Sequence, residues 1–116
     1  MVEPEKNQYP TEWLSIPDVA ELLDETPGRV RRLLTEQYLV ATRRTGTVTI
    51  PSVFIREGRP LGSLRGTLIA LRDVGLSDDE SIDWLLSVDD TMGREPIAAL
   101  LDGHKSEVRR IARTLL

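Results

Sequence analysis

Apolar residues recur at helical spacing in two segments near the start of the chain. Ser15 precedes the first segment and Thr26 precedes the second, and a proline stands in the first turn of each. Because Ser and Thr side chains accept backbone hydrogen bonds at helix starts, we expect helices over residues 16–24 and 27–36. The two stripes are Ile16, Val19, Ala20, Leu22 and Leu23, then Val30, Leu33 and Leu34.

After Gln37 the pattern changes from helical spacing to two extended segments. Residues 39–42 and 47–50 are rich in β-branched and aliphatic side chains, and they flank Arg43-Arg44-Thr45-Gly46. This pattern predicts a short hairpin with Gly46 in its turn. Pro51 is expected to end the second strand, because proline has no amide proton for a ladder.

The second half of the chain carries apolar positions at helical spacing throughout. Ser77 and Glu80 form a capping-box pattern, and glycines follow two of the expected helices. Helices are expected over residues 63–74, 77–86, 96–101 and 105–115. The predicted fold class is mainly α with a small β-hairpin: a winged helix-turn-helix followed by a C-terminal helical bundle.

Three segments are expected along the chain. Residues 1–11 lack apolar periodicity and carry Pro4 and Pro10, so a flexible tail is predicted there and the fold is expected to begin near Trp13. Residues 12–60 are predicted to form a winged helix-turn-helix domain, and residues 61–116 a C-terminal helical domain.

Composition excludes several classes of chemistry. The chain has no cysteine and one histidine, so disulfides, thiolate zinc sites and multi-histidine metal sites are not expected, and no cofactor is predicted. No apolar run approaches the roughly 18 residues that cross a membrane. The first ten residues are acidic and polar, unlike a secretory signal, and a cytoplasmic location is therefore expected.

Charge is segregated along the chain. The net charge is -4, yet residues 27–72 hold nine arginines and only two acids. Residues 1–26 and 73–96 are strongly acidic, with seven and eight acids and one base each. Because salt screens charges beyond about 8 Å, a local basic face can bind DNA on an acidic protein. A solvated face paired with the flanking acids explains the same charges.

Angular placement on the helix predicted over 27–36 separates a core face from a polar face. Gly28, Arg32 and Thr35 lie opposite the apolar residues, with Arg29 and Arg31 on the flanks. Arginine pairs with the O6 and N7 atoms of guanine in the major groove, and Arg29 and Arg32 are the candidates for reading bases. Arg31 lies nearer the core, where it reaches either a phosphate or an acid of the first helix, such as Glu21 or Asp24.

The predicted hairpin tip places Arg43 and Arg44 beside Thr45 and Thr47. Side chains of this kind bind phosphates when a wing lies along the DNA backbone, and a plain exposed hairpin is the alternative. The candidate DNA-binding residues are Gly28, Arg29, Arg31, Arg32, Thr35, Arg43, Arg44, Thr45 and Thr47, and the expected partner is double-stranded DNA. Arg56, Arg59 and Arg65 extend the basic stretch as weaker candidates.

Residues 13–23, 26–34, 39–44 and 50–51 resemble the winged helices of MerR-type regulators and phage excisionases. The whole chain, with Gly66-Thr67-Leu68 and Trp84-Leu85, is similar to an actinobacterial family of small winged-helix DNA-binding proteins known from mycobacteria. That resemblance implies non-enzymatic DNA binding through Gly28, Arg29, Arg32, Arg43 and Arg44, and a separate small C-terminal domain. Many helix-turn-helix turns contain glycine, and residues 24–26 do not.

A transcriptional regulator is the preferred interpretation. An alternative function and an alternative role for the C-terminal apolar stripes stay open. Trp84-Leu85-Leu86, residues 92–97 and Leu100-Leu101 resemble the toxin-binding segment of antitoxins, which would make the C-terminal helices a surface for a protein partner. The apolar stripes of these helices fit a core or, alternatively, a homodimer seam. An enzyme is not expected, because the acids at residues 78–83 are explained by helix capping.

Overall fold

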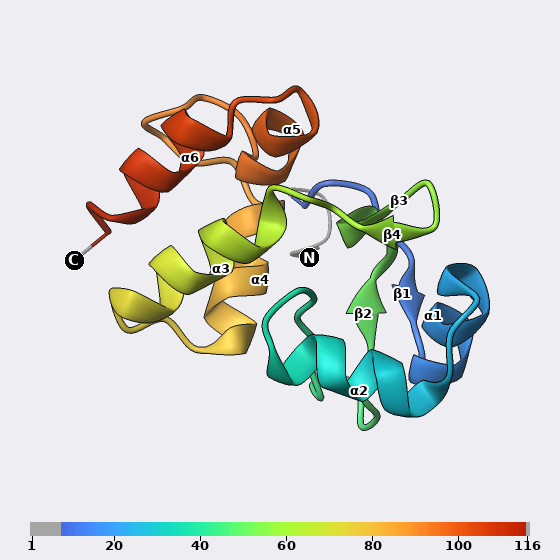
Figure 1. Cartoon of the computed structure of the whole chain (residues 1–116). Helices are drawn as coiled ribbons and strands as arrows, with labels where there is room; N and C mark the ends of the chain where they lie inside the picture. The colour runs from blue at the N-terminus through green and yellow to red at the C-terminus, as the bar shows by residue number, and fades with distance from the viewer. Residues whose placement is uncertain (1–7, 116) are drawn as a thin grey trace, which may run out of the picture.

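The computed structural model describes residues 8–115, and it confirms the predicted fold class (Figure 1). The N-terminal half holds α1 (Ile16–Leu23), α2 (Pro27–Thr35) and four two-residue strands, while the C-terminal half contains helices only. The strands are β1 (Trp13–Leu14), β2 (Ile50–Pro51), β3 (Ile55–Arg56) and β4 (Arg59–Pro60), with a short 3₁₀ helix at Ser52–Phe54. The C-terminal helices are α3 (Leu64–Asp73), α4 (Asp78–Leu86), α5 (Pro96–Leu101) and α6 (Lys105–Ala112).

Both helices of the helix-turn-helix begin at the predicted caps. The Ser15 hydroxyl accepts from the Asp18 amide, and the Thr26 hydroxyl accepts from the Arg29 amide at 3.1 Å. Asp24 ends α1 in the left-handed conformation with φ 56°, which turns the chain toward α2 without a glycine. Leu22, predicted as part of the apolar stripe, is 53% exposed. At about 100° per residue it points well away from the buried side chains of α1, which are Ile16, Val19 and Ala20.

The predicted hairpin is shorter than expected. Thr42 and Thr49 exchange two backbone hydrogen bonds of 2.9 Å in a single isolated bridge. Beyond that bridge the second segment leaves its neighbour and pairs with β1, where Leu14 faces Ile50 and Trp13 faces Pro51. Residues 43–48 therefore form a loop closed by one bridge, which we call the wing loop. Gly46 lies in it at φ 95°, a conformation that favours glycine.

The C-terminal helices bury their apolar stripes against one another. Helix α3 packs on α6 and α4, and α5 packs on α4 and α6. Leu71, Leu85, Ile97 and Val108 are fully buried. These stripes therefore form the core of the C-terminal half. A homodimer would have to use a surface other than these apolar stripes.

Residues 8–11, which precede Trp13, also contact the rest of the fold. The Tyr9 amide donates to the Leu86 carbonyl at 2.6 Å, and Gln8 forms a bridge with Ser87 at the end of α4. The Thr11 hydroxyl accepts from the Val53 amide. Residues 8–11, predicted as part of a tail, thus contact both halves of the protein, and the remainder of that tail lies outside the described residues.

Thr26→Ala is expected to lower the free energy of unfolding by about 1 kcal/mol, because it leaves the Arg29 amide at the start of α2 without its acceptor. Urea denaturation monitored by circular dichroism measures the change. Thr26→Ser keeps the hydroxyl and serves as the control, with a stability near that of the wild type. Equal losses in both variants would show that the methyl group, and not the cap, matters.

Candidate nucleic-acid interface

Helix α2 has one buried face and one arginine-rich face. Val30 is fully buried and Leu33 is 6% exposed, whereas Arg29, Arg31 and Arg32 are all exposed. Gly28 and Thr35 are exposed at the two ends of the same helix. The structure thus brings the predicted residues of α2 onto one solvent-facing surface, as their spacing indicated.

Arg31 has neither of the acidic partners considered for it. Within residues 8–115, the ion pairs of 4.0 Å or less involve Arg44, Arg72 and Arg94, and not the arginines of α2. The Arg31 carbonyl accepts a hydrogen bond from the Thr35 hydroxyl at 3.1 Å, a contact within the helix. The guanidinium groups of α2 are therefore available to an external anion.

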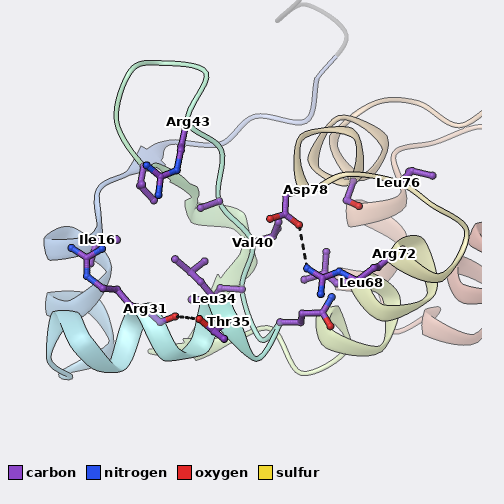
Figure 2. Close-up of a pocket in the computed structure, with 15 residues that line it drawn as sticks. Ile16, Arg31, Leu34, Thr35, Val40, Arg43, Leu68, Arg72, Leu76 and Asp78 are labelled. Carbon is purple, nitrogen blue, oxygen red and sulfur yellow. Dashed lines mark hydrogen bonds and ion pairs between the residues drawn. The ribbon is translucent and has the colours of Figure 1, made fainter.

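The two wing arginines differ from each other. Arg43 is exposed and extends from the wing loop (Figure 2). Arg44 instead contacts carboxylates of α4 in the C-terminal half. Arg44 donates to both carboxylate oxygens of Asp83, at 2.8 and 3.2 Å, and lies 3.6 Å from a carboxylate oxygen of Asp79. The hydrogen bond to Asp83 raises the pKa of Arg44 further, against a smaller opposing effect of burial. The carboxylates of α4, rather than DNA, neutralise Arg44 in this structure.

Thr45 and Thr47 are exposed in the wing loop, where the Thr45 hydroxyl donates to the Thr47 carbonyl at 3.3 Å. The buried Thr42 hydroxyl accepts from the Arg44 amide and from its Nε atom. These local bonds hold the loop in shape. A phosphate that bound the Thr45 hydroxyl would replace the bond to Thr47.

Two arginines that were weaker candidates for DNA contact have structural partners. Arg65 Nε donates to the carbonyl of Glu36, the residue that caps α2, at 2.9 Å, and its guanidinium lies 4.7 Å from the centre of the Tyr38 ring. Arg56 donates to the Leu101 carbonyl. Sequence alone could not reveal these contacts, since the acceptors are backbone carbonyls distant in the chain.

The contact between Arg44 and Asp83 is expected to contribute about 0.2–1 kcal/mol to stability, because both side chains are 47% exposed and solvent screens the pair. A double-mutant cycle with Arg44→Ala, Asp83→Ala and the double variant, followed by thermal unfolding, isolates this coupling. Arg72 and Asp78, at 3.9 Å and more exposed, provide the comparison pair with a smaller expected coupling. Strict additivity for Arg44 and Asp83 would contradict the expectation.

The order of elements and the basic helix define a winged helix-turn-helix protein. One family model, described as "DNA-binding protein Rv2175c, wHTH domain", matches residues 8–55. A second, described as "Rv2175c C-terminal domain of unknown function", matches residues 61–115. The chain belongs to this Rv2175c family, and the resemblance to small winged-helix proteins known from mycobacteria is confirmed.

A curated relative and a solved structure agree with this assignment. The chain is 38% identical over 93 residues to the DNA-binding protein Rv2175c of Mycobacterium tuberculosis (strain ATCC 25618 / H37Rv), an alignment that covers 79% of this chain and 60% of the relative. The NMR structure of Rv2175c superposes with a TM-score of 0.81 at 34% identity, and the match covers 99% of this chain and 84% of that one. The narrower likeness to MerR-type regulators and excisionases stays a prediction.

No helix within residues 8–115 is long and apolar enough to cross a membrane. Asp89, which follows α4, accepts from the Trp84 indole and from the amides of Thr91 and Met92. That carboxylate therefore holds the loop after α4 in place.

Proposed function

We propose that this protein binds double-stranded DNA and acts as a transcriptional regulator, without catalysing a reaction. One observation carries the proposal: α2 exposes three arginines that have no carboxylate partner among the described residues, on a helix whose other face is buried. A surface of this kind suits the major groove, which is about 12 Å wide and admits a helix. The relative from Mycobacterium tuberculosis, named a DNA-binding protein, supports the same conclusion.

Each site residue has a distinct role in the proposal. Arg29 and Arg32 read base edges, and Arg31 binds a phosphate beside the groove. Gly28 has no Cβ atom in the first turn of α2, which lets a phosphate approach the positive end of the helix. Thr35 lies in the last turn and faces the same side.

The wing loop is proposed to lie along the DNA backbone. Arg43, Thr45 and Thr47 are exposed there and contact phosphates. Arg44, held by Asp83, acts first as a positioning residue that sets the direction of the loop, and contacts DNA at its exposed edge. The antitoxin-like alternative has no support in the matches, which are to a DNA-binding protein and a domain of unknown function.

Fluorescence anisotropy with labelled duplex DNA at several salt concentrations tests the proposal. Each neutralised phosphate adds about -0.9 to the slope of log affinity against log salt, so the proposed phosphate contacts of Arg31, Arg43 and Arg44 give a slope of about -3. An absence of binding at low salt, or a slope near zero, would refute the proposal.

A matched variant tests the location of the interface. Arg110→Ala/Arg113→Ala removes two exposed arginines from the end of α6, outside the proposed interface. The proposal requires this variant to keep the wild-type affinity and slope. A slope reduced by about 2 would move the DNA site to the C-terminal half.

A further inference from the structure

A cavity of about 300 Å³ lies between α2, the wing loop and the C-terminal helices α3 and α4. Figure 2 shows Arg31 and Thr35 on the α2 side, Arg43 coming from the wing loop, and Leu68, Arg72, Leu76 and Asp78 on the opposite wall. Volumes of this size are at the lower end of those that hold small organic ligands. Arg31 and Thr35 belong both to the exposed face of α2 and to the wall of this cavity, whereas Arg29 and Arg32 do not line it.

The walls of the cavity combine apolar surface with positive charge. Leu34, Ala41, Val48 and Leu76 line it and are only partly buried, so their aliphatic surface faces the space. Three arginines from three different elements also line it, with a single aspartate as the one acid among the lining residues. Apolar walls with a few charged groups are typical of ligand pockets.

The charges of the cavity are poorly neutralised within the protein. Arg72 is 3.9 Å from Asp78, and both side chains are more than half exposed. Arg31 and Arg43 take part in none of the ion pairs found in residues 8–115. An anionic group on an apolar ligand would complement this arrangement better than a neutral or cationic one would.

We propose that this cavity binds a small amphipathic organic anion, with an apolar body against the aliphatic walls and a carboxylate or phosphate head attracted by the combined positive charge of Arg31, Arg43 and Arg72. The bound anion competes with DNA, because Arg31 and Arg43 serve both ligands. The competition rests on the proposed DNA binding, whereas the anion site itself does not.

Decanoate is the first probe, titrated into the whole protein without DNA and followed by the backbone amide signals in NMR spectra. The amides of Ala41, Val48 and Leu76 are expected to shift together and to saturate. Decanol, which has the same kind of chain without the charge, is expected to bind at least about fivefold more weakly. Shifts confined to other residues, or equal binding of decanol, would overturn the proposal.

Charge variants give effects of opposite sign that a general loss of structure would not produce. Arg43→Ala and Arg72→Ala are each expected to weaken decanoate binding about three- to fivefold, as for exposed ion pairs. Asp78→Asn removes the acid from the cavity and is expected to strengthen decanoate binding. Arg110→Ala, on α6, is the matched control and should leave the affinity unchanged. Equal affinities in all four variants would overturn the proposal.

The competition is measured with labelled duplex DNA in the presence of decanoate. At a decanoate concentration ten times its own Kd, the apparent Kd for DNA is expected to rise about tenfold. Decanoate that binds in the cavity and leaves the DNA affinity unchanged would overturn the competition. A protein that binds decanoate and no DNA would refute the proposed function while the anion site stands.

Discussion

Phe54→Ala is expected to lower the free energy of unfolding by about 3–5 kcal/mol, the range found when a buried aromatic side chain is truncated. Phe54 is the one phenylalanine of the chain and is fully buried. It lies where the 3₁₀ helix leads into β3, and its carbonyl accepts from the Leu61 amide just before the C-terminal helices. The cavity left by the ring would therefore lie within the hydrophobic core.

Urea denaturation compares this variant with the wild type. Because small domains are stabilised by only about 5–15 kcal/mol, the midpoint should fall steeply or the protein should be largely unfolded. Leu22→Ala is the control, since Leu22 is 53% exposed and its loss should cost about 0.5 kcal/mol or less. Similar losses in both variants would show that Phe54 is not a core residue.

Arg29→Ala/Arg32→Ala is expected to reduce the affinity for a preferred DNA sequence by about 30-fold or more. Each bidentate contact with guanine contributes about 1–3 kcal/mol of discrimination, and the variant removes two arginines that carry that role. A preferred duplex is first selected with the wild-type protein from a random pool. Anisotropy titrations then compare this duplex with a scrambled one, and the preference between them should largely disappear.

Arg31→Ala is the comparison variant for this experiment. Because Arg31 is proposed to contact a phosphate, its replacement by alanine should weaken binding to both duplexes equally and reduce the salt slope by about 1. If Arg29→Ala/Arg32→Ala keeps the full preference for the selected duplex, these residues do not read bases. The recognition surface would then have to be sought on the wing loop.

The helix-turn-helix could be predicted from sequence because its signals are local. Ser15 and Thr26 lie next to the helices they cap, and the spacing of Val30 and Leu33 reveals the buried face of α2. Exposure of the arginines follows from the same spacing. The placement of these residues on one surface therefore needed no knowledge of contacts between distant segments.

The wing could be predicted only in part. The β-branched and aliphatic residues of 39–42 and 47–50 indicated extended chain, but the pairing of Ile50 with Leu14 joins segments more than thirty residues apart and leaves no local signal. The ion pair between Arg44 and Asp83 likewise joins residues 39 positions apart and leaves no local signal. Arg44 follows the alternative in which the basic stretch is paired with the flanking acids, but the sequence could not show that Asp83 would be its partner.

The polar contacts between the two halves would also affect the entropy of the proposed DNA binding. They lie at separate points: the wing loop through Arg44, the end of α2 through Arg65, and the start of the chain through Tyr9. A hinge movement that swung the C-terminal helices away would break several of these contacts at once. Helix α2 and the wing loop are thus preorganised, so that little conformational freedom would be lost on binding, and an ordering of either element by DNA is not needed.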